Sequence, residues 1–131
     1  MLLDLRTVPG GDADGLRETV SRLAGDGIVV EDLVVLPVVD TDLADPFVVL
    51  VREALLAAGQ DDVPASPARY FTDASVLASL LSADGDTPAP TVILGPGEPD
   101  QCHVVDEWCS AAKVEVAVEV YAALLDRWCG G

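Results

Sequence analysis

The apolar residues of the chain follow two spacings, which divide it into expected strands and expected helices. Four runs carry apolar residues on successive positions or on both faces, as strands do, and the longest of them is rich in β-branched residues. These expected strands are residues 2–8, 28–39, 68–71 and 91–95. Pro37 places the second at a sheet edge or at an irregular end. The last, TVILG, is continuously apolar, which is typical of a buried parallel strand.

Four other segments repeat their apolar residues every three or four positions, which predicts helices. They cover residues 15–25, 46–59, 72–82 and 113–128. Pro46 in the first turn and Gly59 past the end mark the second helix. Thr72 or Asp73 is the expected cap of the third. Because strands and helices alternate, the sequence predicts an α/β fold that opens with a β-α-β unit.

Composition and charge narrow the classes of function. The 131 residues suffice for one domain, or for one domain with a small added lobe, and half of them are hydrophobic, so a buried core is expected. Seven basic residues stand against 23 acids, which gives a net charge of −16. Such a chain repels nucleic acids and anionic membranes. No apolar run approaches the ~18–20 residues of a membrane span, and the first residues lack the pattern of a signal peptide.

The stretch GPGEPDQCHVVDEW, residues 95–108, holds the only histidine of the chain, His103. From the residues alone, His103 is either a metal ligand or a surface residue of an acidic loop. Asp106 and Glu107, which follow it, are more readily helix caps than catalytic groups. The Gly-Pro-Gly that precedes it lacks the Lys-Ser/Thr of a phosphate-binding loop.

The three cysteines, Cys102, Cys109 and Cys129, are odd in number and contain no C-x-x-C pair. They therefore predict neither a disulfide framework nor a thiolate zinc site. A local site of Cys102, His103 and Cys109 remains an alternative, although its spacing matches no standard pattern. We expect a reduced, cytoplasmic protein.

Three motifs follow one another in the second half of the chain: a Thr-Asp-Ala turn, a Gly-Pro-Gly turn after an apolar run, and a histidine followed by two variable residues and Asp-Glu-aromatic. They are Thr72-Asp73-Ala74, Gly95-Pro96-Gly97, and His103 with Asp106-Glu107-Trp108. This order resembles the carboxy-terminal part of the acetylornithine deacetylase and succinyl-diaminopimelate desuccinylase family, which are co-catalytic zinc metallopeptidases and amidohydrolases. The LDLRTVPG segment also resembles the entry to the second half of that family's lid, so the similarity covers nearly the whole chain.

The resemblance implies a fold in two parts. Residues 1–42 would form a partial lid or dimerisation lobe, as a β-α-β unit. Residues 43–131 would form the carboxy-terminal part of a catalytic domain with a parallel sheet between helices.

The resemblance also assigns roles to single residues. His103 would be a ligand of zinc (or cobalt), and Asp106 and Glu107 would orient its imidazole, as metal-bound histidines usually require. Thr72 and Asp73 would lie beside the substrate pocket.

Gly95 and Gly97 would let the backbone approach the substrate. Two positions depart from the family. Phe71 stands where many members have glycine, and Cys102 replaces an alanine beside the ligand.

The family's remaining ligands and its general base have no counterpart here, because the sequence contains neither His-x-Asp nor Glu-Glu. We therefore expect no catalytic residue in this chain. The resemblance implies a carboxy-terminal portion of a deacylase of N-acyl amino acids, inactive alone. The alternatives are a non-catalytic dimerisation module on the same scaffold and one half of a split enzyme. The expected partner is a second copy or a complementing chain that resembles the family's amino-terminal half.

Overall fold

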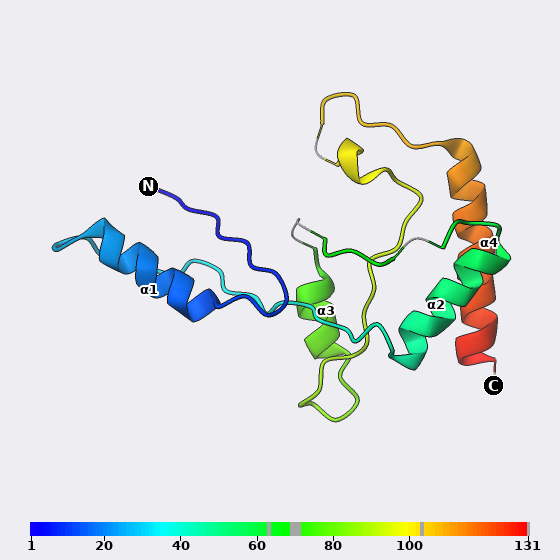
Figure 1. The fold of residues 1–131 in the computed structure, drawn as a ribbon, viewed down its shortest axis with the longest axis horizontal. Coiled ribbons are helices and arrows are strands. Elements are labelled where there is room, and N and C mark those ends of the chain that lie inside the picture. Colours follow the sequence, from blue (N-terminus) through cyan, green and yellow to red (C-terminus); the bar gives the residue numbers. More distant parts are fainter. Residues whose placement is uncertain (63, 69–71, 103, 131) are drawn as a thin grey trace. The chain divides into compact units, whose positions relative to one another are not determined.

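The structure is a computed structural model that describes residues 1–62, 64–68, 72–102 and 104–130. In these ranges the chain forms α-helices and one short 3₁₀ helix (Figure 1). They are α1 (Ala13–Ala24), α2 (Pro46–Ala57), α3 (Ala74–Leu80), η1 (Pro99–Gln101) and α4 (Ala111–Cys129). None of these helices is long and apolar enough to cross a lipid bilayer.

The chain divides into two compact units, each built from two segments. The first unit comprises Met1–Asp40 and Ser66–Thr91, and the second comprises Thr41–Ala65 and Val92–Gly131. The first crossing between units thus falls close to the expected boundary at residue 42. The assignment of a lid and a catalytic part to the two sides of that boundary stays a prediction.

The predicted α/β fold is wrong, because no described residue belongs to a strand. Among the described residues, neither the β-α-β unit nor the parallel sheet between helices is formed; residues 69–71 of the expected strand 68–71 lie outside them. Strand propensity reflects the fit of a side chain to a pleated surface that a neighbouring strand completes. Among the described parts of residues 2–8, 28–39 and 91–95, no ladder of hydrogen bonds forms. Their apolar side chains stay largely uncovered, with Leu2 78% and Val29 80% exposed.

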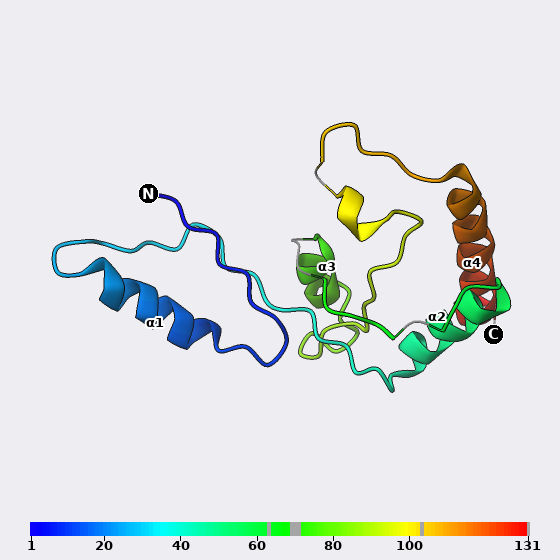
Figure 2. The same ribbon diagram turned by 45° about the horizontal axis from the view of Figure 1, so that its top comes forward.

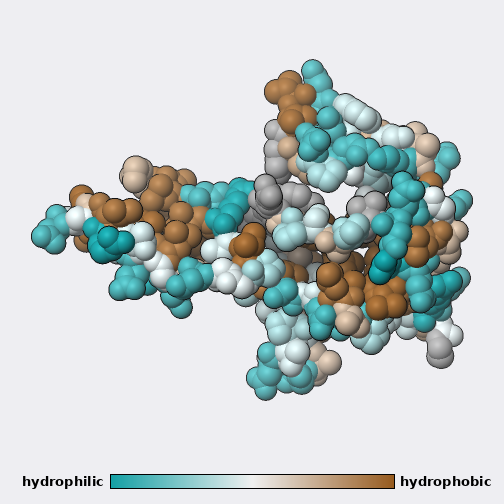
Figure 3. Space-filling view, viewed as in Figure 1, coloured by the Kyte–Doolittle hydropathy of each residue, from teal (hydrophilic) through white to brown (hydrophobic). Residues whose placement is uncertain are grey.

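The predicted helices are confirmed, and their caps explain where they begin. Asp12 starts α1, because its carboxylate accepts a hydrogen bond from the main-chain N–H of Gly15 at 2.8 Å. The helix ends at Gly25, whose φ of 86° suits glycine. No residue of α1 is buried. Figure 3 shows many apolar residues at the surface around α1 and the extended segments beside it.

Helix α3 is short, and it anchors the loop that follows it. The side chain of Thr72 accepts a hydrogen bond from the N–H of Ala74 at 3.3 Å, whereas that of Asp73 makes no cap. Ala78 is buried, and its carbonyl oxygen accepts a hydrogen bond from the N–H of Ala89 at 2.7 Å. The loop between them therefore closes back onto the helix.

Asp84 organises this loop. Its carboxylate accepts hydrogen bonds from the N–H of Thr87 (2.7 Å), the N–H of Asp86 (2.9 Å) and the hydroxyl of Ser82 (2.9 Å). These donors stabilise the ionised form, so they hold the pKa of Asp84 well below its usual range.

The core of the second unit lies between α2 and α4, which pack side by side (Figures 1 and 2). Asp45 caps α2 through the N–H of Phe47 at 2.8 Å, and Pro46 occupies the first helical position. Phe47 meets Trp128 of α4 edge to face, with ring centroids 5.1 Å apart and an interplanar angle of 67°. Further along the contact the buried side chains are Val51, Ala54 and Val120. This helix pair carries the candidate site.

Candidate functional site

A pocket of about 130 Å³ lies in the second unit. Its walls are the end of α2, the Gly95-Pro96-Gly97 turn and one face of α4. That face carries Lys113, Ala117 and Tyr121, which recur every four residues and so lie above one another on the helix. Most of the wall is apolar, and polar groups come from Gln60, Lys113 and Tyr121. The pocket thus combines an apolar interior with a few polar groups, as small-molecule sites do.

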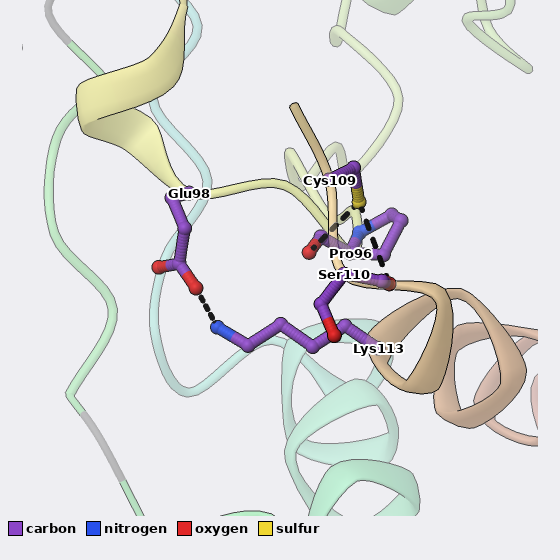
Figure 4. A network of polar contacts seen from close by, with 5 residues as sticks. All are labelled: Pro96, Glu98, Cys109, Ser110 and Lys113. Atoms are coloured by element: carbon purple, nitrogen blue, oxygen red, sulfur yellow. Dashed lines mark hydrogen bonds and ion pairs between the residues drawn. The ribbon is translucent and has the colours of Figure 1, made fainter. Parts of the chain in front are cut away.

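Side-chain contacts hold the Gly-Pro-Gly turn against α4. The hydroxyl of Tyr121 donates a hydrogen bond to the carbonyl oxygen of Leu94 at 2.6 Å. Just beyond the turn, the ammonium of Lys113 forms an ion pair with the carboxylate of Glu98 (Figure 4). The thiol of Cys109 lies 3.5 Å from the carbonyl oxygen of Pro96 (Figure 4). The turn is therefore fixed at both ends.

Outside the pocket, an ion pair joins α2 to the chain that leaves it. The guanidinium of Arg52 meets Asp62 through two hydrogen bonds, of 2.6 and 2.5 Å. The hydrogen bond from Arg52 lowers the pKa of Asp62. This contact spans the turn at Gly59, which leads to Gln60 of the pocket wall.

The structure leaves both glycines of the turn accessible. A Cβ atom added at Gly95 or at Gly97 would meet no other atom within 4 Å, and neither residue has a positive φ. The fold itself therefore does not require glycine at these positions. Open space beside a bare backbone agrees with the expected approach of a small molecule, and both residues line the pocket.

The other described residues that were predicted for the site do not line this pocket. His103 and Phe71 fall outside the described residues. Asp106 and Glu107 are exposed, and Asp106 adopts a φ of 61°. Helix α4 begins after Ser110, so neither acid caps it.

Thr72 and Asp73 belong to the first unit, at the start of α3, whereas Gly95 and Gly97 belong to the second unit. The structure thus brings the two glycines into one pocket. The roles of all the predicted site residues, the two glycines included, stay predictions.

The described residues do not fit a hydrolytic metal centre. Such a zinc takes about three protein ligands and keeps one position open. Among the described residues, no three His, Cys, Asp or Glu side chains are grouped so that they could hold an ion. Cys102, Cys109 and Cys129 are all free and exposed. No reaction step through a metal can be assigned to these residues.

Sequence reasoning missed Gln60, Lys113 and Tyr121 as pocket residues. Lys113 carried a signal, because it is the only lysine in a strongly acidic chain. The sequence also pointed to Tyr121, because it lies on the same face of the helix as Lys113. Gln60 gave none, because its position depends on a contact between distant residues.

Comparison with known proteins identifies the class. The sequence model of peptidase family M20/M25/M40 matches residues 9–127. This is a family of metallopeptidases and related amidohydrolases that generally depend on metal ions. The chain therefore belongs to peptidase family M20/M25/M40. Searches of curated proteins and of solved structures find no significant match.

Proposed function

We propose that this chain supplies the carboxy-terminal part of a metal-dependent amidohydrolase of the acetylornithine deacetylase type. The observation that carries the proposal is the family match over residues 9–127. The three motifs support the narrower assignment, because they occur inside the match in the expected order. The spacing from Gly97 to His103 resembles that of acetylornithine deacetylase. The substrate would be a small N-acyl amino acid.

In this proposal, each predicted residue has one role. His103 is a ligand of zinc or cobalt, and Asp106 and Glu107 orient it. Gly95 and Gly97 present bare backbone to the substrate, which their open surroundings support.

Thr72 and Asp73 would lie near the substrate when the active site is complete. Their place at the start of α3 leaves the carboxylate of Asp73 free of a capping bond. It is therefore available for a polar contact with a ligand.

The 131-residue chain alone would not hydrolyse an amide, because it holds one histidine and neither the His-x-Asp nor the Glu-Glu of the family. Activity requires a general base and further metal ligands. A complementing chain with those motifs would supply them. The second candidate is a non-catalytic interaction module, and the exposed apolar residues of the first unit favour it.

The test measures hydrolysis of N-acetylornithine and other N-acetyl amino acids in the presence of zinc or cobalt. The purified chain alone is expected to match a His103→Ala control. Mixed with a chain that bears His-x-Asp and Glu-Glu, it is expected to give turnover that His103→Ala abolishes. Turnover by the chain alone, above the His103→Ala control, would disprove the proposal that the chain is inactive without a partner. Turnover by the mixture that survives His103→Ala would disprove the role of His103, and no turnover by the mixture would favour the interaction module.

A further inference from the structure

The pocket of the second unit is partly open to solvent, and its described wall carries one cation. Its volume of about 130 Å³ is close to the ~150 Å³ of an apolar cavity that holds benzene in another protein. A group of about six carbon atoms therefore fits. Leu55, Val116 and Val120 offer such a group an apolar wall, and Val120 is only 2% exposed.

Among the described residues that line the pocket, Lys113 is the one with a positive charge. The hydroxyl proton of Tyr121 is used in the hydrogen bond to Leu94, so the described side chains that can donate to a ligand are Lys113 and the amide of Gln60. Lys113 lies in the first turn of α4, which carries no acidic residue, and Ser110 makes no side-chain cap there. The positive end of the helix and the ammonium therefore both favour an anion at this end of the pocket.

The present partner of Lys113 is Glu98, a residue of the same chain. The two side chains are 49% and 39% exposed. Ion pairs this open to water contribute little to stability and exchange partners readily. The carboxylate of Glu98 thus occupies the ammonium of Lys113, a residue of the pocket wall, although Glu98 itself does not line the pocket.

We infer that this pocket binds a small carboxylic acid with a short apolar group, and that the carboxylate of the ligand replaces Glu98 on Lys113. The apolar group fills the space between α2 and α4, beside the Gly95-Pro96-Gly97 turn. Glu98 then acts as an internal competitor that lowers the affinity. The inference concerns binding alone, and it holds whether or not the chain takes part in amide hydrolysis.

The alternative is that the Lys113–Glu98 pair only secures the turn. The two cases differ in the effect of removing the charge of Glu98. For an internal competitor, Glu98→Gln tightens ligand binding. For a purely structural contact, Glu98→Gln loosens the turn and weakens binding or leaves it unchanged.

Because Lys113 is the only lysine, lysine labelled with ¹⁵N gives a single side-chain signal from the pocket. The probe is 4-methylpentanoate, and its matched control is 4-methylpentanamide, which has the same shape without the charge. Acetate is the control for the apolar group. We expect 4-methylpentanoate to shift the Lys113 signal in a saturable manner. Both controls are expected to bind at least about tenfold more weakly than 4-methylpentanoate, since each lacks one of the two interactions.

Three variants complete the experiment, with binding followed through the ring signals of Tyr121 and folding through circular dichroism. Lys113→Met is expected to abolish saturable binding, and Lys113→Arg to retain it. Glu98→Gln is expected to tighten binding about two- to fivefold, the range that an exposed ion pair represents. Equal binding of the amide, or no saturable binding by the wild type, would overturn the inference. So would a folded Glu98→Gln variant without gain in affinity. If Lys113→Met does not fold, the inference is tested by two other results. They are the difference in affinity between the acid and the amide, and the affinity of the Glu98→Gln variant.

Discussion

The hydroxyl of Tyr121 donates a hydrogen bond to the carbonyl oxygen of Leu94, 2.6 Å away and 27 residues earlier in the chain. This contact joins the middle of α4 to the segment that enters the Gly-Pro-Gly turn. Tyr121→Phe removes the bond and keeps the ring. We expect the free energy of unfolding to fall by about 0.5–1.5 kcal/mol, the usual net value of such a bond.

Urea denaturation of the wild type and of the Tyr121→Phe variant measures this change in the free energy of unfolding. A Tyr121→Phe variant with unchanged stability and unchanged backbone signals at Gly95 would show that the hydrogen bond does not hold the turn.

The core between α2 and α4 predicts a contrast between two valines of one helix. Val120 is 2% exposed, whereas Val118 is 62% exposed. Val120→Ala should lower the free energy of unfolding by about 1–3 kcal/mol, because it removes buried methyl groups and leaves a cavity. Val118→Ala should change it by less than about 0.5 kcal/mol. Similar losses from both substitutions, measured by denaturation, would contradict the packing of α4 on α2.

The loop after α3 predicts a dependence on pH. The pKa of Asp84 is held below its usual range, chiefly by the N–H of Thr87 and then by the N–H of Asp86 and the hydroxyl of Ser82. Since the folded pKa is depressed, the stabilisation is present above the unfolded pKa of about 3.9 and is lost as the pH falls toward the folded value. Titration of the carboxyl carbon of Asp84 by NMR measures the folded pKa.

The matched variants for this titration are two serine-to-alanine changes. Ser82→Ala removes one donor, so it should raise the pKa of Asp84 and shift the loss of loop structure to higher pH. Ser79→Ala, an exposed change on the preceding helix, should leave the titration as it was. A titration of Asp84 at its ordinary value in the wild type would refute the prediction.

Metal binding by the chain alone is expected to be weak. The described residues hold no group of three potential ligands, and the sequence adds a single histidine. The net charge of −16 attracts divalent cations diffusely, and salt screens that attraction. Calorimetry at moderate salt should therefore detect no tight zinc site. One tight site that His103→Ala removes would instead support the local Cys102, His103 and Cys109 alternative.

Self-association should increase with salt. Most apolar residues of segments 2–8 and 28–39 are exposed, and large uncovered patches favour association. The charge of −16 opposes it until salt screens the repulsion. We expect a homodimer through these segments, since a typical interface of ~1,600 Å² outweighs the screened repulsion.

Sedimentation velocity at low and high salt tests this association, with Val29→Asp as a variant that should weaken it. A monomer at both salt concentrations would exclude the dimer.

The helices could be predicted from the sequence because their signals are local. Asp12, Asp45 and Gly25 mark helix ends through contacts within a few residues. The strands could not, since β-branched runs predict a strand only if a neighbouring strand completes it. Residues 28–39 have the composition of a strand, but no neighbouring strand pairs with them among the described residues.

In the candidate site, too, local features could be predicted from the sequence and long-range contacts could not. The Gly95-Pro96-Gly97 turn was identified from its motif, and the structure places it in the pocket wall. The pocket also depends on Leu55 and Tyr121, which lie far apart in the sequence and meet only through the packing of α2 on α4. No local pattern encodes such a contact.

The pairing of α2 with α4 also sets an order of events during synthesis. Residues 58–110 separate the two helices, so α2 leaves the ribosome long before its partner exists. At about 5–20 residues per second, roughly 4–15 s pass before α4 is complete. Throughout that interval the face of α2 with Val51 and Ala54 has nothing to cover it. The nascent chain therefore exposes this face of α2 to aggregation and chaperone capture until α4 arrives, and the long intervening loop must close before the two helices can pack.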